Sequence, residues 1–221
     1  IVKTLANTTT SFLDSNLANQ VYYYRIKAVD ANGIESSYSD IITTQKVASK
    51  IYVATTGADT NLGSADSPLK TILKAISNAF SGDTIVLANG TYTNSATLQI
   101  SKQLFFTSNY LSTKDTNDIA KTIITGGTGF TLFNTASPHP TFTIFGLTLQ
   151  NHGSFLIVPS STVVIDRCII NNNGNASELY QNIIVLRSNS RLINSTLTNN
   201  KGIIQIYDNN TRVERNKFIG N

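Results

Sequence analysis

Two small sets of residues have the types and spacing that chemistry would need. In the first set, Asp59, Asn61 and Gly63 form the pattern Asp-x-Asn-x-Gly, which is the front half of a calcium loop, where carboxylate and amide oxygens hold the ion. The later acidic ligand of such a loop does not follow, and a loop of Asx turns explains the same residues. Asp59 and Asn61 are the candidate metal ligands, and calcium is the one cofactor that the sequence suggests.

The second set is Arg187 and Asp208, which lie 21 residues apart. This spacing recurs along the second half of the chain, so it predicts that the two side chains occupy equivalent positions in adjacent repeats. An arginine can neutralise a negatively charged substrate at a reacting centre. Arg187 and Asp208 are the candidate catalytic residues, and an exposed ion pair between repeats is the alternative.

The other reactive side chains indicate no site. Asp166 and Glu214 share a repeat position, but they lie two repeats apart, roughly 10 Å at the usual strand spacing, which is too far to share an ion. His139 and His152 each lack a second histidine at metal-ligand spacing, and both are expected in loops. Cys168, the single cysteine, excludes a disulfide within the chain and is expected to be buried.

The composition favours β structure. Of 221 residues, 40% are hydrophobic and 14% are charged, and short runs of Val, Ile, Tyr and Phe recur. The net charge of +4 permits an anionic partner, but no run of about five or six basic residues indicates a nucleic acid. No apolar run approaches the roughly 18 residues that cross a bilayer. Because the chain has no methionine and begins and ends in mid-pattern, we expect it to be a piece of a longer protein. We also expect a bacterial protein and a monomer.

The second half of the chain contains an internal repeat. Four segments superpose: FTIFGLTLQNHG (142–153), VVIDRCIINNNG (163–174), RLINSTLTNNKG (191–202) and TRVERNKFIGN (211–221). One aligned column follows spacings of 21, 27 and 21 residues, and its members are Ile144, Ile165, Leu192 and Val213. A third strand in each repeat is expected to align Leu156, Ile183 and Ile204.

A period of just over twenty residues with two or three short strands is typical of one turn of a parallel β-helix. The aligned apolar residues are then expected to stack in files inside the coil. The asparagines that recur at the turns are expected to adopt left-handed backbone and to form hydrogen bonds along the stack. Residues 85–87, a short apolar run between two glycine turns, are expected to form an early strand of this coil.

SPLKTILKAISNAF, residues 67–80, is the one helix that the sequence predicts. Ser67 is expected to be its N-cap and Pro68 its first residue. Its apolar stripe comprises Leu69, Ile72, Leu73, Ile76 and Phe80. A lone amphipathic helix before a series of strands needs an apolar surface to cover, and we expect it to cap the open end of the β-helix.

Residues 50–93 resemble the amino-terminal region of the right-handed parallel β-helix proteins of the pectate-lyase-like superfamily. The matching elements are Tyr52-Val53, Gly57-x-Asp59-x-Asn61-x-Gly63, Ser67-Pro68 before the helix, Gly82-Asp83-Thr84 and Gly90-Thr91-Tyr92. The repeat extends the resemblance to residue 221. It implies an all-β fold in which residues 51–221 form a right-handed parallel β-helix, truncated at its C-terminus, with a cap helix over about 67–80.

The same resemblance implies that catalytic members act on acidic polysaccharides, often by β-elimination, with an Arg or Lys base and in some members calcium. The calcium-dependent members hold the ion with several carboxylates from neighbouring coils. Such a ladder of acids is nearly absent from this sequence. Related β-helix starts also occur in surface proteins without activity, so the fold alone does not fix the reaction.

The first 46 residues resemble the second half of a fibronectin type III domain, strands E to G. Leu17 and Tyr22 fit the leucine and tyrosine that form its tyrosine corner, residues 30–33 fit a turn, and SDIITTQ (39–45) fits a returning strand. The outward face of the strand at 21–28 is read as a solvated sheet face and not as a nucleic-acid surface. Residues 47–50 are expected to link the two domains.

Together the two resemblances predict a secreted or surface-exposed modular protein whose β-helix binds or processes an anionic polysaccharide. The 221 residues are expected to lack catalysis of their own. The alternative is a non-catalytic scaffold or adhesin at the cell surface. Charged side chains clustered in one outer groove would favour the first hypothesis, and a uniform amide and hydroxyl surface would favour the second.

Overall fold

The computed structural model describes residues 3–12, 14, 21–45, 49–127, 130–157, 161–174, 182–187 and 189–221. The chain divides into two compact units, Ile1–Val47 and Ala48–Asn221. Within the described residues, no helix is long and apolar enough to cross a membrane.

Among the described residues of the first unit, β1 (Val21–Tyr24) and β2 (Ile42–Gln45) form an antiparallel strand pair. The turn expected at residues 30–33 is present, where the Asp30 carboxylate accepts hydrogen bonds from the backbone N–H groups of Asn32 and Ile34. Tyr24 donates a hydrogen bond from its hydroxyl to Asp14. Leu17, the partner expected in a tyrosine corner, lies outside the described residues.

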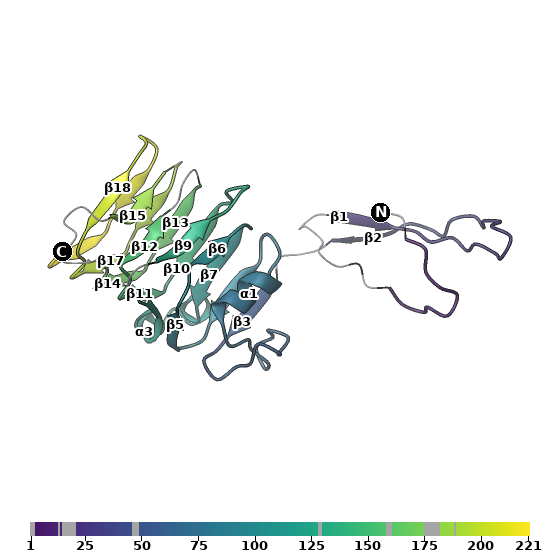
Figure 1. Ribbon diagram of the computed structural model, residues 1–221, viewed down its shortest axis with the longest axis horizontal. Helices are drawn as coiled ribbons and strands as arrows, with labels where there is room; N and C mark the ends of the chain where they lie inside the picture. Colours follow the sequence, from purple (N-terminus) through teal and green to yellow (C-terminus); the bar gives the residue numbers. More distant parts are fainter. Residues whose placement is uncertain are drawn as a thin grey trace. The chain divides into compact units, whose positions relative to one another are not determined.

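The second unit consists of three parallel sheets that the chain visits in turn, as in a parallel β-helix (Figure 1). The first sheet contains β3 (Lys50–Val53), β4 (Thr84–Leu87), β7 (Leu104–Ser108), β10 (Phe142–Phe145), β13 (Val163–Asp166), β16 (Arg191–Ile193) and β19 (Arg212–Glu214). The second contains β5 (Gly90–Asn94), β8 (Thr122–Gly126), β11 (Thr148–Gln150), β14 (Ile169–Asn171), β17 (Thr196–Thr198) and β20 (Lys217–Ile219). The third contains β6 (Leu98–Ile100), β9 (Thr131–Thr135), β12 (Ser154–Ile157), β15 (Asn182–Leu186) and β18 (Ile203–Ile206).

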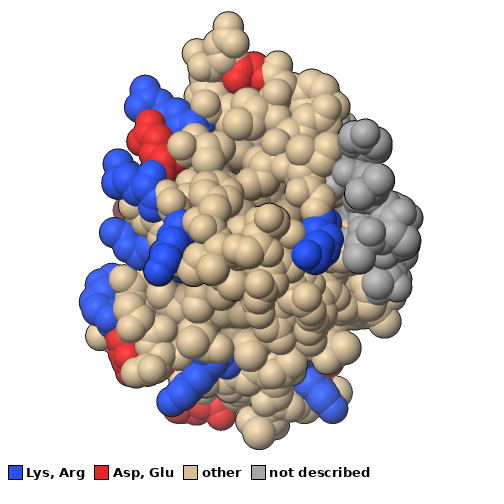
Figure 2. Space-filling model, turned by 90° about the vertical axis from the view of Figure 1, so that its left-hand side faces the viewer, with Lys and Arg blue, Asp and Glu red and all other residues tan. Residues whose placement is uncertain are grey.

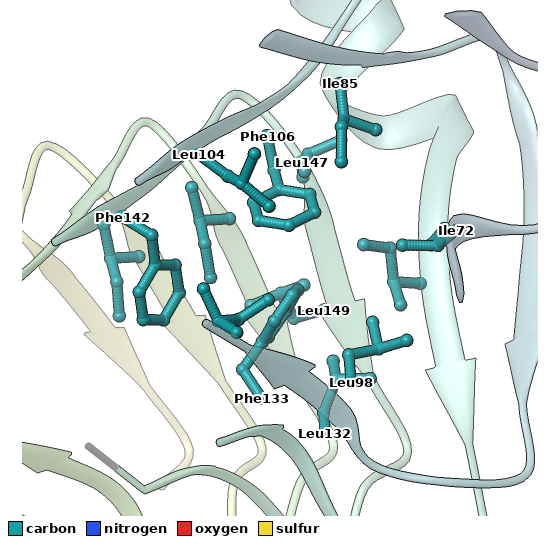
Figure 3. Packing of buried hydrophobic residues seen from close by; sticks show 14 of the residues in the cluster. Ile72, Ile85, Leu98, Leu104, Phe106, Leu132, Phe133, Phe142, Leu147 and Leu149 are labelled. Carbon is teal, nitrogen blue, oxygen red and sulfur yellow. The ribbon is translucent and has the colours of Figure 1, made fainter. Parts of the chain in front are cut away.

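The strand register confirms the first predicted column. Ile144, Ile165, Leu192 and Val213 follow one another across β10, β13, β16 and β19, and the file extends back through Phe106 and Ile85. Because side chains alternate along a strand, every second residue points inward. These files form the core, where Phe106, Phe133 and Phe142 pack ring against ring (Figure 3).

The predicted turn asparagines are confirmed. Asn151, Asn172 and Asn199 have positive φ angles of 57°, 54° and 53°, and Gly220 takes the same place in the last coil with 60°. Asparagine tolerates this left-handed backbone better than most residues. The Asn172 side chain also donates to the Asn151 side chain in the coil before it, at 2.7 Å.

A second ladder lies one residue further along, inside the coil. Asn173 and Asn200 are buried, and each accepts a hydrogen bond from the backbone N–H at the same place in the preceding coil. Each also donates to a backbone carbonyl of that coil, Leu149 for Asn173 and Ile170 for Asn200. These bonds hold adjacent turns together where no strand pairs them.

His152 lies in the turn between β11 and β12, as the sequence predicts, and it occupies the ladder position in the coil before Asn173. The side chain is 1% exposed, and neither ring nitrogen has a hydrogen-bond partner among the described residues. The His152 and Phe130 rings meet edge to face, and Gly126 leaves room for the imidazole, because a Cβ at position 126 would lie 2.7 Å from it. Burial lowers the pKa of His152 to about 4, against an opposing effect of the Ile124 carbonyl.

We expect this histidine to make the second unit less stable in mild acid. The pKa in the folded state lies below the ordinary histidine value of 6.5. The unfolded chain therefore binds the proton first, and stability falls as the pH drops from about 6.5 to 4. The full loss corresponds to about 3 kcal/mol. Urea unfolding at several pH values measures it. His152→Asn, which places the ladder residue there, should flatten this slope, and an unchanged slope would contradict the assignment.

The cap helix is shorter than the sequence predicts. Helix α1 spans Ile72–Asn78, and its N-cap is Thr71, whose side chain accepts from the Lys74 N–H. Ser67 is not the cap, because Leu69 is held in extended backbone by hydrogen bonds with Tyr52 and Ala54 beside β3. Leu73 was expected in the buried stripe but is 58% exposed.

The Gly82-Asp83-Thr84 motif has a structural role. The Asp83 carboxylate is fully buried and accepts hydrogen bonds from the backbone N–H groups of Ser49 and Phe80. Nearby, the Lys102 ammonium donates to three carbonyls at the end of α1, those of Ile76, Ser77 and Ala79. Together these groups satisfy backbone polar atoms where the cap meets the first coil.

Two short helices between β7 and β8 were not predicted. They are α2 (Tyr110–Thr113) and α3 (Thr116–Lys121). Asp115 caps α3 by accepting from the Asn117 N–H, and the buried Asp118 accepts from Asn89 and Thr113 side chains. Neither helix has an apolar stripe of useful length, so hydrophobic periodicity could not reveal them.

Candidate functional site

A groove of about 360 Å³ lies beside the α2 and α3 insertion. The insertion supplies one side, and the turns after β13 and β16 supply the other. The residues that line it are Tyr110, Thr116, Ile119, Arg167, Cys168, Ile169, Asn194 and Thr196. The groove therefore combines residues that are up to 86 positions apart in the sequence, brought together by coil stacking.

Aromatic rings border this groove. Tyr110 lies 5.6 Å from Phe145 between ring centroids, and Phe145 lies 5.8 Å from Phe105. Gly146 permits this approach, because a Cβ at that position would lie 2.8 Å from the Tyr110 ring. The Arg167 guanidinium lies 5.7 Å from the Phe145 ring centre, within the range of a cation–π contact.

A file of charged and amide side chains runs across three consecutive coils. Arg167 forms an ion pair with Asp166 at 2.9 Å, and the same carboxylate accepts from the Asn194 side chain at 2.7 Å. The Asn194 side chain in turn accepts from Arg215 at 2.8 Å. The pairing of β13, β16 and β19 places Arg167, Asn194 and Arg215 in one turn column, where their φ angles are 53°, 50° and 55°.

The last two coils add further cations to this surface. Arg212 and Arg215 both contact the Glu214 carboxylate, at 3.4 and 3.6 Å. Arg191 pairs in register with Arg212 on the neighbouring strand and is exposed. We call Arg167, Arg191, Arg212 and Arg215 the arginine face.

The arginine face keeps an excess of positive charge. Its four guanidinium groups outnumber the two adjacent carboxylates, Asp166 and Glu214, so two positive charges remain unbalanced. The side chains of Arg167, Arg212 and Arg215 are 45%, 63% and 65% exposed. Figure 2 shows charged side chains gathered along one edge of the molecule, while most of that view is uncharged. Such a surface attracts anions and can form paired hydrogen bonds to carboxylates.

Comparison with known families places the chain. Residues 55–221 match a family described as "Protein of unknown function (DUF1565)". The chain belongs to this family. The match includes the cap helix and every described strand from β4 to β20, so membership rests on most of the second unit and not on one motif.

Two further proteins are similar to this DUF1565 member. A segment of 56 residues is 43% identical to the pectate lyase PEL9 of Emericella nidulans, covering 25% of this chain and 14% of that protein. A solved structure of a rhamnogalacturonan lyase superposes with a TM-score of 0.54 at 15% identity, over 78% of this chain and 50% of that one. The second likeness concerns the fold. The chain thus spans half or less of the length of these relatives.

Arg187 and Asp208 are not in register in this DUF1565 member. The strand pairing sets Leu186 beside Ile206, so Arg187 falls beside Tyr207, and its guanidinium lies 3.6 Å from that ring centre. A register shift between Asn182 and Ile184 is the cause, because one extra residue in β15 moves everything after it by one place. The same shift aligns Ile184, not Ile183, with Leu156 and Ile204.

The side chains of Arg187 and Asp208 have local roles. Asp208 accepts hydrogen bonds from the Asn210 N–H and the Thr211 hydroxyl, which fixes the turn before β19. Both residues lie away from the groove beside Arg167, whose lining includes neither of them.

Asp59 and Asn61 organise the loop before α1. The Asp59 carboxylate accepts from the Lys70 N–H, the Thr71 N–H and the Thr71 hydroxyl, and the Asn61 side chain donates to the Pro68 carbonyl. Although desolvation opposes the shift, hydrogen bonds from Thr71 and Lys70 hold the pKa of Asp59 below its usual value. Donors that surround a carboxylate do not form a cage of acceptors, so this loop does not fit a calcium ion.

In the part of the chain that the structure describes, no group of three or more His, Cys, Asp and Glu side chains could hold a metal ion. Cys168 is buried as expected, and burial raises the pKa of its thiol to about 12. It is therefore a structural residue and not a thiolate nucleophile.

The arginine face was visible in the sequence only in part. The repeat shows Arg167 and Arg215 in one column with Asn194, and that column could have been proposed as a site. Tyr110 could not have been found this way, because it belongs to the insertion and not to the repeat.

Proposed function

We propose that the second unit binds an acidic polysaccharide along the arginine face. The observation that supports this most directly is the excess of guanidinium groups beside the aromatic pair Tyr110 and Phe145. Charges clustered on one outer surface favour a polysaccharide-binding protein over a scaffold with a uniform amide and hydroxyl surface. The similarity to a pectate lyase and to the fold of a rhamnogalacturonan lyase is in keeping with such a ligand.

The geometry suits a repeating anion. Arg167 and Arg215 occupy the same turn column two coils apart, about 10 Å at the usual strand spacing. Each can present a planar pair of N–H donors to a uronate carboxylate. The ring of Tyr110 offers a flat apolar surface on which the C–H face of a sugar can pack. A linear polymer of uronates running across the coils could thus meet one cation after another.

We further propose that these residues bind without catalysis. Elimination from a uronate needs a group that neutralises the carboxylate and a separate base that removes a proton. The groups that hold Arg167 and Arg215, namely Asp166, Asn194 and Glu214, keep both guanidiniums in ionic or hydrogen-bonded contacts. The arginine face accordingly supplies binding, and a base is not identified among the residues that line the groove.

The setting that we propose is extracellular. The strand pair of the first unit and its residue pattern resemble the end of a fibronectin type III domain, a module that commonly spaces carbohydrate-active domains, and the second unit resembles a right-handed β-helix. We infer a secreted or surface-exposed bacterial protein that acts as a monomer. Detection of the full-length protein only inside cells, after fractionation into medium, surface and cytoplasm, would contradict this inference.

The arginine face predicts a measurable loss of binding. Arg167→Ala/Arg215→Ala should weaken binding to polygalacturonate by at least about tenfold, because each charge-assisted contact is worth about 1.5–3 kcal/mol. Isothermal titration at low ionic strength measures the affinity, and added salt should weaken it in the native chain. Lys74→Ala/Lys201→Ala removes the same charge elsewhere and should bind as the native chain does.

Three results would count against the proposal. If the native chain does not bind the polymer, the scaffold hypothesis is favoured. If the double arginine variant binds unchanged, the polymer lies elsewhere. If the native chain releases products with the ultraviolet absorbance of unsaturated uronides, the protein is a lyase and the non-catalytic reading is wrong.

A further inference from the structure

A second cavity lies at the capped end of the second unit. Its volume is about 580 Å³, and it is bounded by the loop after β3, the start of α1 and the segment that leads from β5 to β6. None of its lining residues lines the groove beside Arg167. The cavity is therefore separate from the site proposed above.

Threonine hydroxyls line one side of this cavity. Tyr92 points into the core, so the alternation along β5 places Thr91 and Thr93 outward and exposed. Thr55 joins them from the loop after β3, where Gly90 permits a close approach, because a Cβ there would lie 2.8 Å from the Thr55 methyl carbon. Among the described residues, none of these three hydroxyls has a hydrogen-bond partner.

Asn94 contributes an unsatisfied donor. It lines the same cavity at the end of β5, and its side-chain nitrogen is buried without a hydrogen-bond partner among the described residues. A buried donor left unpaired costs about 1–3 kcal/mol. If the side chain rotates toward the cavity, an oxygen atom of a ligand there would accept from this nitrogen and remove that cost.

The other residues that line this cavity add apolar surface and no net charge. Leu73 lines the cavity from α1 and is 58% exposed, although a helix that only caps a core would turn such a residue inward. Asp59 and Lys70 carry opposite charges, so the cavity has no net charge. This differs from the positive surface of the arginine face.

We propose that this cavity binds a neutral mono- or disaccharide. Hydroxyl groups both donate and accept, as sugar hydroxyls do, and Leu73 can pack against the C–H face of a pyranose ring. The Asn94 amide can donate to a ring or hydroxyl oxygen. Because the charges of the lining residues cancel, the cavity has no net electrostatic attraction for a sugar carboxylate. The expected ligand is therefore a neutral sugar. The proposal does not depend on polysaccharide binding at the arginine face.

The test uses the 221-residue chain with four probes. NMR titrations of isotope-labelled protein use three neutral probes, methyl α-D-galactopyranoside, methyl α-L-rhamnopyranoside and cellobiose. The fourth probe is methyl α-D-galacturonoside, the acidic counterpart of the galactopyranoside. At least one neutral probe should bind saturably, with shifts at Thr91, Thr93 and Asn94, and more tightly than the galacturonoside.

Two variants locate the site. Ala96→Trp, which fills the cavity from an exposed position, and Asn94→Leu, which removes the amide, should each weaken binding by at least about tenfold. Arg167→Ala/Arg215→Ala should leave it within about twofold. Circular dichroism and thermal unfolding show that each variant is folded. The proposal is overturned if no neutral probe saturates the native chain, if both cavity variants bind as tightly as the native chain, or if the galacturonoside binds best.

Discussion

Gly174→Ala is expected to destabilise the second unit by about 4 kcal/mol or more, which would lower its melting temperature by roughly 10 °C. A Cβ at position 174 would lie 1.4 Å from the Lys201 carbonyl oxygen of the next coil, where no side chain can fit. The φ angle of +90° adds a conformational cost for any residue with a Cβ.

The obstacle cannot be relieved locally. The Gly174 N–H donates to the His152 carbonyl at 2.7 Å, and the Lys201 N–H donates to the Asn173 carbonyl at 2.6 Å, so the glycine is tied to the coils on both sides. Moving it away from Lys201 stretches one set of bonds, and moving the two coils apart breaks the strand pairs of β14 with β17. Either movement breaks backbone hydrogen bonds, and the groups that lose their partners inside the stack cannot find others.

Thermal and urea unfolding followed by circular dichroism measure this effect. Gly127→Ala is the matched control, because the nearest atom to its Cβ would be a Phe130 ring carbon at 4.0 Å. The control should change stability by less than about 0.5 kcal/mol. A Gly174→Ala protein as stable as the control would show that the two coils are not packed as closely as described.

The sequence predicted the columns well because they depend on few variables. Each coil adds one strand to each sheet, so a match of apolar residues at spacings of 21, 27 and 21 fixes which residues stack. The insertion of residues within the middle spacing did not disturb the first sheet. It did accompany the bulge in β15, and a single extra residue there broke the predicted match of Arg187 with Asp208.

Other features depended on contacts that a linear pattern does not contain. Ser67 and Pro68 look like a helix start, but β3 captures Leu69 and delays the helix to Ile72. Asp59 has the sequence context of a metal ligand, but its carboxylate accepts hydrogen bonds from backbone N–H groups at the start of the helix. In both cases a tertiary hydrogen bond outweighed a local propensity.

The groove beside Arg167 could not be predicted from the sequence, because only one of its walls belongs to the repeat. That wall consists of turns whose residues the repeat aligns, whereas the other wall comes from α2 and α3, an insertion outside the repeat. A repeat therefore predicts the stacked wall of a site, such as Arg167 and Arg215, while the residues that close the site from an insertion, such as Tyr110, must come from the three-dimensional structure.

Asn173→Ala is expected to cost about 4 kcal/mol, more than most single substitutions. Its side-chain oxygen accepts from the His152 N–H at 3.0 Å, and its nitrogen donates to the Leu149 carbonyl at 3.1 Å. The same nitrogen donates to the Asn200 side chain, which links this rung of the ladder to the next. Alanine leaves these groups buried and unpaired, at about 1–3 kcal/mol for each.

The control for this substitution is two residues away. Asn171→Ala removes an asparagine at the end of β14 whose side chain is not part of the ladder, and it should cost less than about 0.5 kcal/mol. Urea unfolding of the two variants beside the native chain gives the difference. Equal losses would mean that the buried ladder contributes no more than an ordinary surface amide.

The ladder also predicts how its effects combine. Asn173 and Asn200 share a hydrogen bond, so the double variant Asn173→Ala/Asn200→Ala should lose less stability than the sum of the two single variants. Separate, additive losses would place the two side chains in independent environments. Because the ladder joins turns that no strand pairs, a shortfall from additivity would show that the coils are held together along their corners as well as through their sheets.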